Sequence, residues 1–481
     1  MVYNFDLIVI GTGSGASSAA RKCAREGWKV AVIDERPFGG TCALRGCDMK
    51  KILMGAAEIA DWNTRMNGKG VEGKTSIVWH DLMVFKRSFV RDYSENFEKG
   101  LTDAGITTFH GTARFIGEDQ VEVNEQTLQG GHILIATGAR PMPLSINGEE
   151  NIVFSDYFLD MDTLPRDIVF IGGGMISLEF AHIAARAGST VTIIERQDRP
   201  LLNFDADLIR LLMQKSEDIG IRFLGNTIVH SVEKEGGKFI IKGSSKAPAE
   251  VSREGDTQGI PEGDVQGITE VDTKETAAEE KILLSCDLVV HGAGRIPDID
   301  RLNLAAGNVA SGRHGITVNE YMQSVSNPKI YSAGDASDTR GLPLTPIAGM
   351  ESAIAAINLL KGNTARPDYR VMPSVVFTVP QIATVGLSEE QAIEAGYECY
   401  THTLDTSGWY TYKRTNEKYA MAKIVIDRKT NCILGAHFIS SEAAELVNHF
   451  ATAIQMQIDI KQLKRMMFAY PTTASDIIYM L

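Results

Sequence analysis

The chain has 481 residues, of which 44% are hydrophobic and 23% are charged, and its formal net charge is −13. At roughly 150 residues per domain, this length predicts about three globular domains. No apolar run is long enough to span a bilayer, and an apolar segment that begins at Phe5 leaves no room for a secretion signal, so we expect a cytoplasmic protein that does not bind a membrane. The negative net charge would repel phosphate backbones, so we also expect no binding to nucleic acid.

Residues 6–35 predict a strand, a glycine-rich turn, a helix and a second strand that ends in an acid. Gly11 permits the tight turn, Gly13 lets the backbone approach a pyrophosphate, and Ala16 lets the helix pack closely on the strand. The phosphates of a dinucleotide would lie at the helix N-terminus, and Asp34 would accept a hydrogen bond from a ribose hydroxyl. A later segment repeats this order, which predicts two dinucleotide sites, or one site and a copy that has lost its function.

The second copy covers residues 168–195 and has its fingerprint at Gly172, Gly174 and Ser177. Glu195 ends its second strand, where a carboxylate accepts the ribose 2′-hydroxyl of NADH and repels the 2′-phosphate of NADPH. Arg196 and Arg199 follow, and either could instead pair with that phosphate. The pattern favours NADH.

Cys42 and Cys47 lie close together in a glycine-rich segment that leads into a predicted helix. On a regular helix their Cα atoms would be about 8 Å apart, beyond the roughly 7 Å that a disulfide tolerates, so bridging them must distort the first turn. A strained disulfide is easily reduced, and a thiolate near a helix N-terminus has a lowered pKa. The spacing predicts a redox pair, and we expect no metal here because no companion cysteine or histidine pattern lies nearby.

The second half of the chain contains two further changes of composition. Residues 244–280 are rich in polar residues and glycine, which predicts a solvated insertion between two strands of the second domain. From Val371 onward, alternating apolar runs precede helical patterns, which predicts a separate α+β domain. The predicted limits are 1–150 for a first dinucleotide domain, 151–290 for the second, 291–366 for the return to the first, and 367–481 for the last domain.

Several motifs occur together in one order along the chain. They are GTGSGA, GGTC followed by GC and a lysine, ATGARP, the second glycine-rich unit, HGAGRIPD, YSAGD, LTPIA and VVFTVPQIATVGLSEEQA. The set resembles the class I pyridine nucleotide-disulfide oxidoreductases, which include glutathione reductase, dihydrolipoamide dehydrogenase and mercuric reductase, over essentially the whole length. The resemblance implies an α/β fold with two Rossmann-like domains that bind FAD and NAD(P)H, and a C-terminal α+β dimerisation domain.

The resemblance also implies roles for single residues. FAD would occupy the first site, and NADH or NADPH the second. Cys47 would be the thiol nearer the flavin, and Cys42 would attack the substrate. Asp335 would hydrogen-bond the ribityl chain, and Lys51 would form an ion pair with Glu179 near flavin N5. The other cofactor-binding residues that it implies are Gly15, Glu35, Thr41, Ala113, Thr137, Gly138, Arg196, Gly294 and Thr345.

The C-terminal segment departs from the family pattern. Where disulfide-reducing members supply a histidine and then a glutamate from the partner subunit, this chain has Tyr470 and then Ser475 or Asp476. A tyrosine with a pKa of about 10 is a poor acid–base shuttle at neutral pH. We therefore expect an acceptor that needs little acid assistance, such as a disulfide with an acidic leaving thiol, a quinone or a thiophilic metal ion; alternatively, Tyr470 only packs at the subunit interface.

Asp48 is a second departure, because relatives usually have an apolar residue after the second cysteine. Facing inward, its charge would raise the pKa of Cys47; facing solvent, it would stabilise the helix turn.

These observations predict a homodimeric FAD-dependent NAD(P)H oxidoreductase that passes electrons to a Cys42–Cys47 disulfide and on to a small-molecule disulfide or other thiol-reactive acceptor. The alternatives are a quinone reductase or oxidase, a mercuric-reductase-like enzyme, for which the C-terminal cysteine pair is missing, and a nucleotide-binding sensor or structural flavoprotein.

Overall fold

The computed structural model of the chain describes residues 2–246 and 279–481, and its first region is built on a seven-stranded sheet. The strand order is β3-β2-β1-β6-β5-β4, and β18 also pairs with β6. The end of the central strand β1, from Leu7 to Ile10, is buried on both faces, which is why that part of its sequence is a continuous apolar run. Leu7 and Val9 pack against α1 and α9, whereas Ile8 and Ile10 join a core on the opposite face.

The elements of this first region follow one another from the N-terminus, with a return after residue 290. They are β1 (Val2–Ile10), α1 (Ser14–Arg25), β2 (Val30–Asp34), α2 (Gly40–Arg45), α3 (Cys47–Met66), α4 (Trp79–Val90), α5 (Tyr93–Thr102), β3 (Thr107–His110), β4 (Arg114–Gly117), β5 (Gln120–Val123), β6 (Gln126–Ile135), β7 (Ala139–Pro141), β15 (Arg295–Pro297), β16 (Ser311–Gly312), β17 (Gly315–Thr317), β18 (Ile330–Ser332), β19 (Ser337–Asp338) and α9 (Thr345–Lys361).

The second region repeats the strand–turn–helix–strand order on a parallel four-stranded sheet, β10-β9-β8-β14, beside an antiparallel sheet, β11-β12-β13. Its elements are α6 (Ser155–Phe158), β8 (Asp167–Ile171), α7 (Met175–Arg186), β9 (Thr190–Ile194), α8 (Ala206–Asp218), β10 (Ile221–Leu224), β11 (Thr227–Glu235), β12 (Lys238–Lys246), β13 (Glu279–Cys286) and β14 (Leu288–His291). The predicted insertion leaves between β12 and β13, which pair directly with each other. Residues 247–278 of it lie outside the described residues.

The C-terminal region is an antiparallel five-stranded sheet, β20-β21-β24-β23-β22, packed against α12. This confirms the predicted α+β architecture, while the predicted residue limits of the domains stay a prediction. The elements are β20 (Ser374–Val376), β21 (Gln381–Gly386), α10 (Glu389–Glu394), β22 (Cys399–Asp405), α11 (Tyr410–Lys413), β23 (Met421–Asp427), β24 (Ile433–Ser440), α12 (Ala443–Gln455), α13 (Ile460–Leu463) and α14 (Ile477–Met480).

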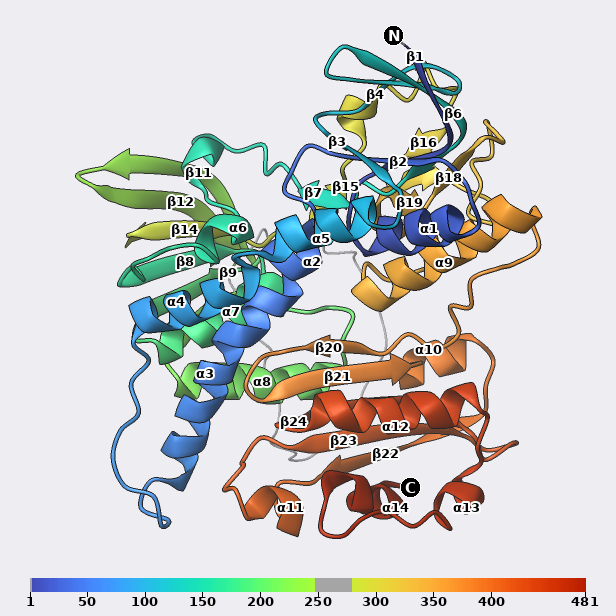
Figure 1. Cartoon of the computed structure of the whole chain (residues 1–481). Helices are drawn as coiled ribbons and strands as arrows, with labels where there is room; N and C mark the ends of the chain where they lie inside the picture. The colour runs from blue at the N-terminus through green and yellow to red at the C-terminus, as the bar shows by residue number, and fades with distance from the viewer. Residues whose placement is uncertain (1, 247–278) are drawn as a thin grey trace, which may run out of the picture.

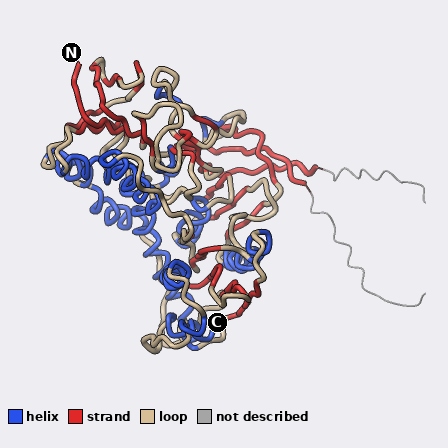
Figure 2. Tube along the Cα trace, turned by 90° about the vertical axis from the view of Figure 1, so that its right-hand side faces the viewer, coloured by secondary structure: helices blue, strands red, loops and turns tan. Residues whose placement is uncertain are grey.

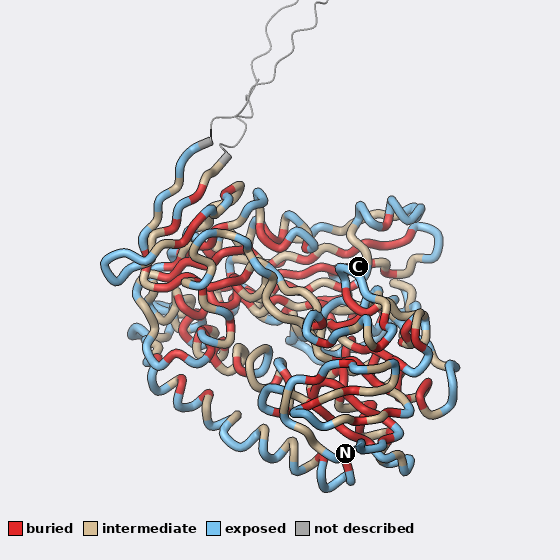
Figure 3. The backbone as a smooth tube through the Cα atoms, turned by 90° about the horizontal axis from the view of Figure 1, so that it is seen from above, coloured by how far each residue is buried: buried red, intermediate tan, exposed pale blue. Residues whose placement is uncertain are grey.

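Helix α3 connects the three regions. It begins beside the first sheet and runs down toward the C-terminal sheet (Figure 1). One hydrophobic core contains Leu53 and Met54 of α3, Phe180 of α7 and Ile382 of β21. Figure 2 shows the helices of the first region lying together against one side of its strands, and Figure 3 shows that the buried segments lie inside, with exposed segments around the outside. Within the described residues, no helix combines the length and the apolar character needed to cross a membrane.

Candidate active site

The first glycine turn connects β1 to α1 and lies where the sequence predicts it. Gly11 has a φ of +109°, and a Cβ there would lie 2.2 Å from the carbonyl oxygen of Ala136, so only glycine fits. Gly13 stands immediately before α1, and Gly15 lies in its first turn, where a Cβ would lie 2.9 Å from the carbonyl oxygen of Ala333. The turn therefore leaves backbone N–H groups at the start of a helix, an arrangement that binds phosphate.

The second turn has the same construction. Gly172 has a φ of +99°, and Gly174 stands immediately before α7. In the first unit Ile10 pairs with Ile33, and in the second Ile171 pairs with Ile194. The residue after each of these second-strand isoleucines is Asp34 in one unit and Glu195 in the other, so the two acids occupy equivalent positions.

The two carboxylates are also held in the same way. Asp34 accepts hydrogen bonds from the Thr12 hydroxyl at 2.5 Å and from the Arg36 N–H at 3.0 Å. Glu195 accepts them from the Gly173 N–H at 2.5 Å and the Gln197 N–H at 3.0 Å. One oxygen of each acid is thus tied to its glycine turn, which fixes the carboxylate next to the expected position of a ribose.

Segments that carry other predicted FAD residues meet at the first turn. A Cβ on Gly11 would lie 3.4 Å from the Thr137 nitrogen. A Cβ on Gly40, next to Thr41, would lie 2.4 Å from the Gly13 Cα, so these two segments pack this closely only because residue 40 is a glycine. Gly15 similarly contacts the segment that leads to Asp335. Burial raises the pKa of Asp335, and the charge of nearby Arg295 offsets only part of this shift.

The remaining predicted residues are more dispersed. Gly138 has a φ of +71° just after β6, Gly294 has a φ of +111° just after β14, and Ala113 is buried beyond β3. Glu35 points its carboxylate at Arg301 and the Thr112 hydroxyl. Ala16 and Ser177 are both buried and pack in the first turns of α1 and α7, whereas Arg196 is exposed.

These residues fit a bound FAD. The Thr137 Oγ1 and the Arg45 Nε are buried without a hydrogen-bond partner among the described residues, and both border the segments that meet at the first turn. Burial lowers the pKa of Arg45, and Asp156 and Asp34 are the acids near it. A guanidinium, a free hydroxyl and a helix N-terminus supply the donors that a pyrophosphate accepts.

Cys42 and Cys47 lie on two different helices because the chain breaks at Gly46. Gly46, with φ −144° and ψ −122°, separates α2 from α3, so the distortion that the sequence predicts takes the form of a break between helices. Both cysteines are free thiols, Cys42 half-buried and Cys47 exposed. Thr345, the first residue of α9, lies near both sulfurs, and its hydroxyl lowers the pKa of each thiol.

The two thiols differ in acidity. Contact with Cys42, together with the charge of Lys50, holds the pKa of Cys47 below its ordinary value, while burial works in the opposite direction. Contact with Cys47, followed by burial, raises the pKa of Cys42. Cys47 is therefore the more acidic thiol of the pair, and Cys42 is the one that holds its proton more tightly.

The predicted ion pair of Lys51 with Glu179 is wrong, since Lys50 makes it. The Lys50 Nζ lies 2.5 Å from the Glu179 Oε2, and the Glu179 side chain is 4% exposed. Lys51 instead lies over the ring of Phe377, and burial lowers its pKa to about 8. Glu179 also accepts a hydrogen bond from the Phe377 N–H at 2.9 Å, which fixes it between α3 and the C-terminal region.

The C-terminal residues that depart from the family pattern lie on the surface or are bonded within the chain. Tyr470 is 79% exposed. Asp476 accepts a hydrogen bond from the Thr411 hydroxyl at 2.6 Å, and Ser475 caps a short helical turn with Thr472. Of these three residues, Tyr470 is thus the one that is free to approach another surface.

Comparisons with known proteins identify the family of the chain. Residues 5–358 match the family described as pyridine nucleotide-disulphide oxidoreductase, and residues 372–480 match the dimerisation domain of the same name. The chain therefore belongs to the pyridine nucleotide-disulphide oxidoreductase family. Its activity is that of an FAD-dependent oxidoreductase that uses NAD(P)H.

Individual relatives cover part or all of the chain. A glutathione reductase of Nostoc sp. is 30% identical over 497 aligned residues, which cover 100% of both proteins. An uncharacterized 19.7 kDa protein in the mercuric resistance operon of Staphylococcus aureus is 56% identical over 180 residues, 37% of this chain and 100% of that protein. The HOCl-induced flavoprotein disulfide reductase RclA from Escherichia coli has the same fold, with a TM-score of 0.81, 24% identity and 98% of each chain covered.

Proposed function

We propose that this chain is an NADH-dependent reductase of a small disulfide, with Cys42 and Cys47 as its redox pair. The observation that carries the proposal is the break at Gly46, which lets two cysteines on successive helices lie close enough to shift each other's pKa in opposite directions. An acidic thiol beside one that keeps its proton suits a dithiol that attacks an acceptor with one sulfur and closes the disulfide with the other. A buried ion pair, Lys50–Glu179, lies directly beside the more acidic thiol.

Bound FAD would supply a two-electron relay between a nicotinamide and a disulfide. The glycine turns, Thr137 and Arg45 would hold its phosphates, and Lys50 would be kept in place by Glu179 near the reacting ring. Cys42 would then attack the acceptor disulfide and release its first thiol. Cys47, already largely thiolate, would attack Cys42 and release the second thiol as the protein disulfide closes.

The preference for NADH rests on the residues that follow β9. The Arg199 guanidinium donates hydrogen bonds to the carbonyl oxygens of Leu202 and Phe204, both at 3.1 Å, so it is committed to its own loop. Glu195 remains at the ribose position, where it repels a 2′-phosphate. We expect kcat/KM for NADH to exceed that for NADPH, and Glu195→Ser to reduce the difference; a strong NADPH preference in the unaltered protein would contradict this reading.

The active form would be a cytoplasmic homodimer. The family's dimerisation domain supports association, and Tyr470, 79% exposed on that domain, is positioned to contact a second copy. In the dimer, Tyr470 would approach the cysteines of the partner.

Alkylation and two serine variants test the redox pair. One equivalent of NADH, added without oxygen, should make Cys42 and Cys47 newly reactive toward iodoacetamide, as measured by peptide mass spectrometry. Cys42→Ser and Cys47→Ser should each keep FAD and its reduction by NADH, yet lose disulfide reduction. If both variants still reduce every acceptor at the original rate, the reduced flavin is discharged directly, and the protein is a quinone reductase or an oxidase.

A further inference from the structure

Asp48 is the charged side chain that contacts the substrate-attacking thiol. The Cys42 thiol donates a hydrogen bond to the Asp48 Oδ1, with 3.8 Å between sulfur and oxygen. The contact crosses the break at Gly46, because Cys42 lies on α2 and Asp48 is the second residue of α3. The structure differs from both orientations that the sequence leaves open, because the carboxylate is exposed yet reaches back to Cys42 and does not raise the pKa of Cys47.

The carboxylate is not used to cap the helix. No side chain caps the N-terminus of α3, and among the described residues Asp48 makes no side-chain hydrogen bond other than the one with Cys42. A first-turn acid would still interact favourably with the helix dipole, but that role needs no thiol within reach. Asp48 is exposed, so its proton can exchange with water.

Disulfide reduction here requires a proton carrier at this place. Contact with Cys47, partial burial and the charge of Asp48 raise the pKa of Cys42, so its proton must leave before Cys42 can attack. Tyr93 faces the same two groups, but burial and the charges of Asp48 and Cys42 raise its pKa, so it holds its own proton and cannot take one from Cys42. Tyr470 stands where relatives have histidine, and a tyrosine is a poor acid–base shuttle at neutral pH.

We propose that Asp48 is the catalytic acid–base of the acceptor half-reaction, taking the proton of Cys42 and delivering it to the departing thiol. This inference rests on the proposed disulfide reduction. Asp48 accepts the Cys42 proton, the Cys42 sulfur attacks one sulfur of the acceptor, and the acceptor's sulfur–sulfur bond breaks. The first product leaves with the proton from Asp48.

The second half of the step restores the protein disulfide. The Cys47 thiolate attacks the Cys42 sulfur of the mixed disulfide, and the second product leaves as a thiolate that is protonated by water. One protein thiol and one protein thiolate are oxidised to a disulfide, while one acceptor disulfide is reduced to a thiol and a thiolate, so electrons and protons balance before water protonates the second product. The same subunit supplies both the nucleophile and its base.

Two acceptors with different leaving thiols test this role. An aromatic nitrobenzoate disulfide releases an acidic thiol that leaves without a proton, whereas bis(hydroxyethyl) disulfide releases an alkyl thiol that needs one. Asp48→Asn should lower kcat/KM for the alkyl disulfide by about 100-fold, the lower end of what general acid–base catalysis contributes, and change the aromatic rate far less. Asp48→Glu should recover part of the alkyl activity.

Asp81→Asn is the matched control, since Asp81 is also an exposed acid in the first turn of a helix, α4, and should change neither rate. Flavin content and the rate of flavin reduction by NADH should be the same in all variants, which separates chemistry from misfolding. An equal loss with both acceptors, or no loss with the alkyl disulfide, would overturn the role of Asp48. Full activity of Cys42→Ser would instead overturn the proposed function on which it rests.

Discussion

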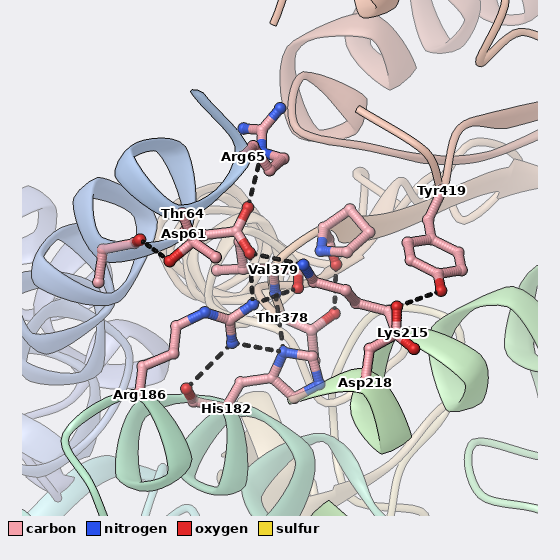
Figure 4. Close-up of polar contacts among 12 residues, drawn as sticks. Asp61, Thr64, Arg65, His182, Arg186, Lys215, Asp218, Thr378, Val379 and Tyr419 are labelled. Carbon is pink, nitrogen blue, oxygen red and sulfur yellow. Dashed lines mark hydrogen bonds and ion pairs between the residues drawn. The ribbon is translucent and has the colours of Figure 1, made fainter. Parts of the chain in front are cut away.

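Replacing Asp61 with asparagine is expected to destabilise the junction of the three regions. Asp61 lies near the C-terminal end of α3 and is 5% exposed. Its carboxylate lies 2.8 Å from the Arg65 Nε, 2.9 Å from the Arg186 Nη2 and 2.7 Å from the Lys215 Nζ (Figure 4). Arg65 also donates a hydrogen bond to the carbonyl oxygen of Thr415 in the C-terminal region at 3.0 Å. Asparagine would leave three poorly hydrated cations without their shared anion.

Two independent magnitudes bracket the loss of stability. Although burial opposes ionisation, Arg186 and Lys215 lower the pKa of Asp61 from 3.8 to about 2. At about 1.36 kcal/mol for each tenfold change in proton affinity, this is worth about 2.4 kcal/mol. Removing one member of a buried ion pair costs about 3–5 kcal/mol. We therefore expect Asp61→Asn to lower the free energy of unfolding by about 2–5 kcal/mol.

Differential scanning calorimetry of the FAD-saturated protein measures this change. At about 2.1 cal/mol/K per residue, unfolding of the whole chain has an entropy of about 1 kcal/mol/K, so the loss lowers the Tm by about 2–5 °C. Asp162→Asn, which removes an exposed partner of Arg87, is the control and should leave the Tm almost unchanged. A Tm for Asp61→Asn within error of that control at pH 7 would refute the reasoning.

The pH dependence gives a second check on the same variant. The pKa of Asp61 is lower in the folded chain than in the unfolded chain, so its stabilisation is complete above the unfolded value of 3.8 and is lost as the pH falls toward 2. The difference in Tm between the two proteins should therefore stay constant from neutral pH down to about pH 5 and shrink below about pH 4. A constant difference across the whole range would mean that packing, rather than charge, causes it.

Three further outcomes are expected. Gly11→Ala should purify without FAD because its Cβ would lie 2.2 Å from a carbonyl oxygen. Gly55→Ala is the control and should keep the flavin, because a Cβ at this position of α3 meets open space. The ratio of flavin to protein absorbance distinguishes the two variants. Lys50→Ala should slow the reduction of flavin by NADH in stopped-flow experiments by roughly tenfold or more, and Lys51→Ala should slow it less, since only Lys50 pairs with the buried acid. Because its pKa lies below the ordinary 9.0, Cys47 should be alkylated by iodoacetamide at pH values where an ordinary thiol is unreactive. Its reactivity should fall only as the pH drops through that lowered pKa. An alkylation rate that rises only near pH 9 would contradict this prediction.

The parts of the site that could be predicted from sequence are those in which local geometry dictates the residue. Gly11 and Gly172 have positive φ and no room for a Cβ, so a glycine at each position is a direct consequence of the turn. The acids Asp34 and Glu195 follow because strand register determines which residue ends beside the turn. Such constraints depend on a few neighbouring residues, and the sequence pattern contains all of them.

The choice between Lys50 and Lys51 could not be predicted in this way. Adjacent residues on a helix point about 100° apart, so one of the two lysines faces Glu179 and the other faces away. Which one depends on the phase of α3, and that phase is set by the break at Gly46 and by packing against Phe377 and α7. A regular helix through both cysteines, which the spacing suggests, would have a different phase. The orientation of Asp48 depends on the same break.

The two dinucleotide units show how different side chains produce the same arrangement of charge. Asp34 is one carbon shorter than Glu195 and does not reach the backbone of its turn; the Thr12 hydroxyl makes the connection, and in the second unit Gly173 at the equivalent position offers its N–H directly. Both solutions leave a carboxylate with unused lone pairs beside a helix N-terminus. On the proposed reading, the negative charge would select against a phosphate on the ribose and the helix N-terminus would attract the pyrophosphate, and these opposite preferences over a short distance would define one orientation for a dinucleotide.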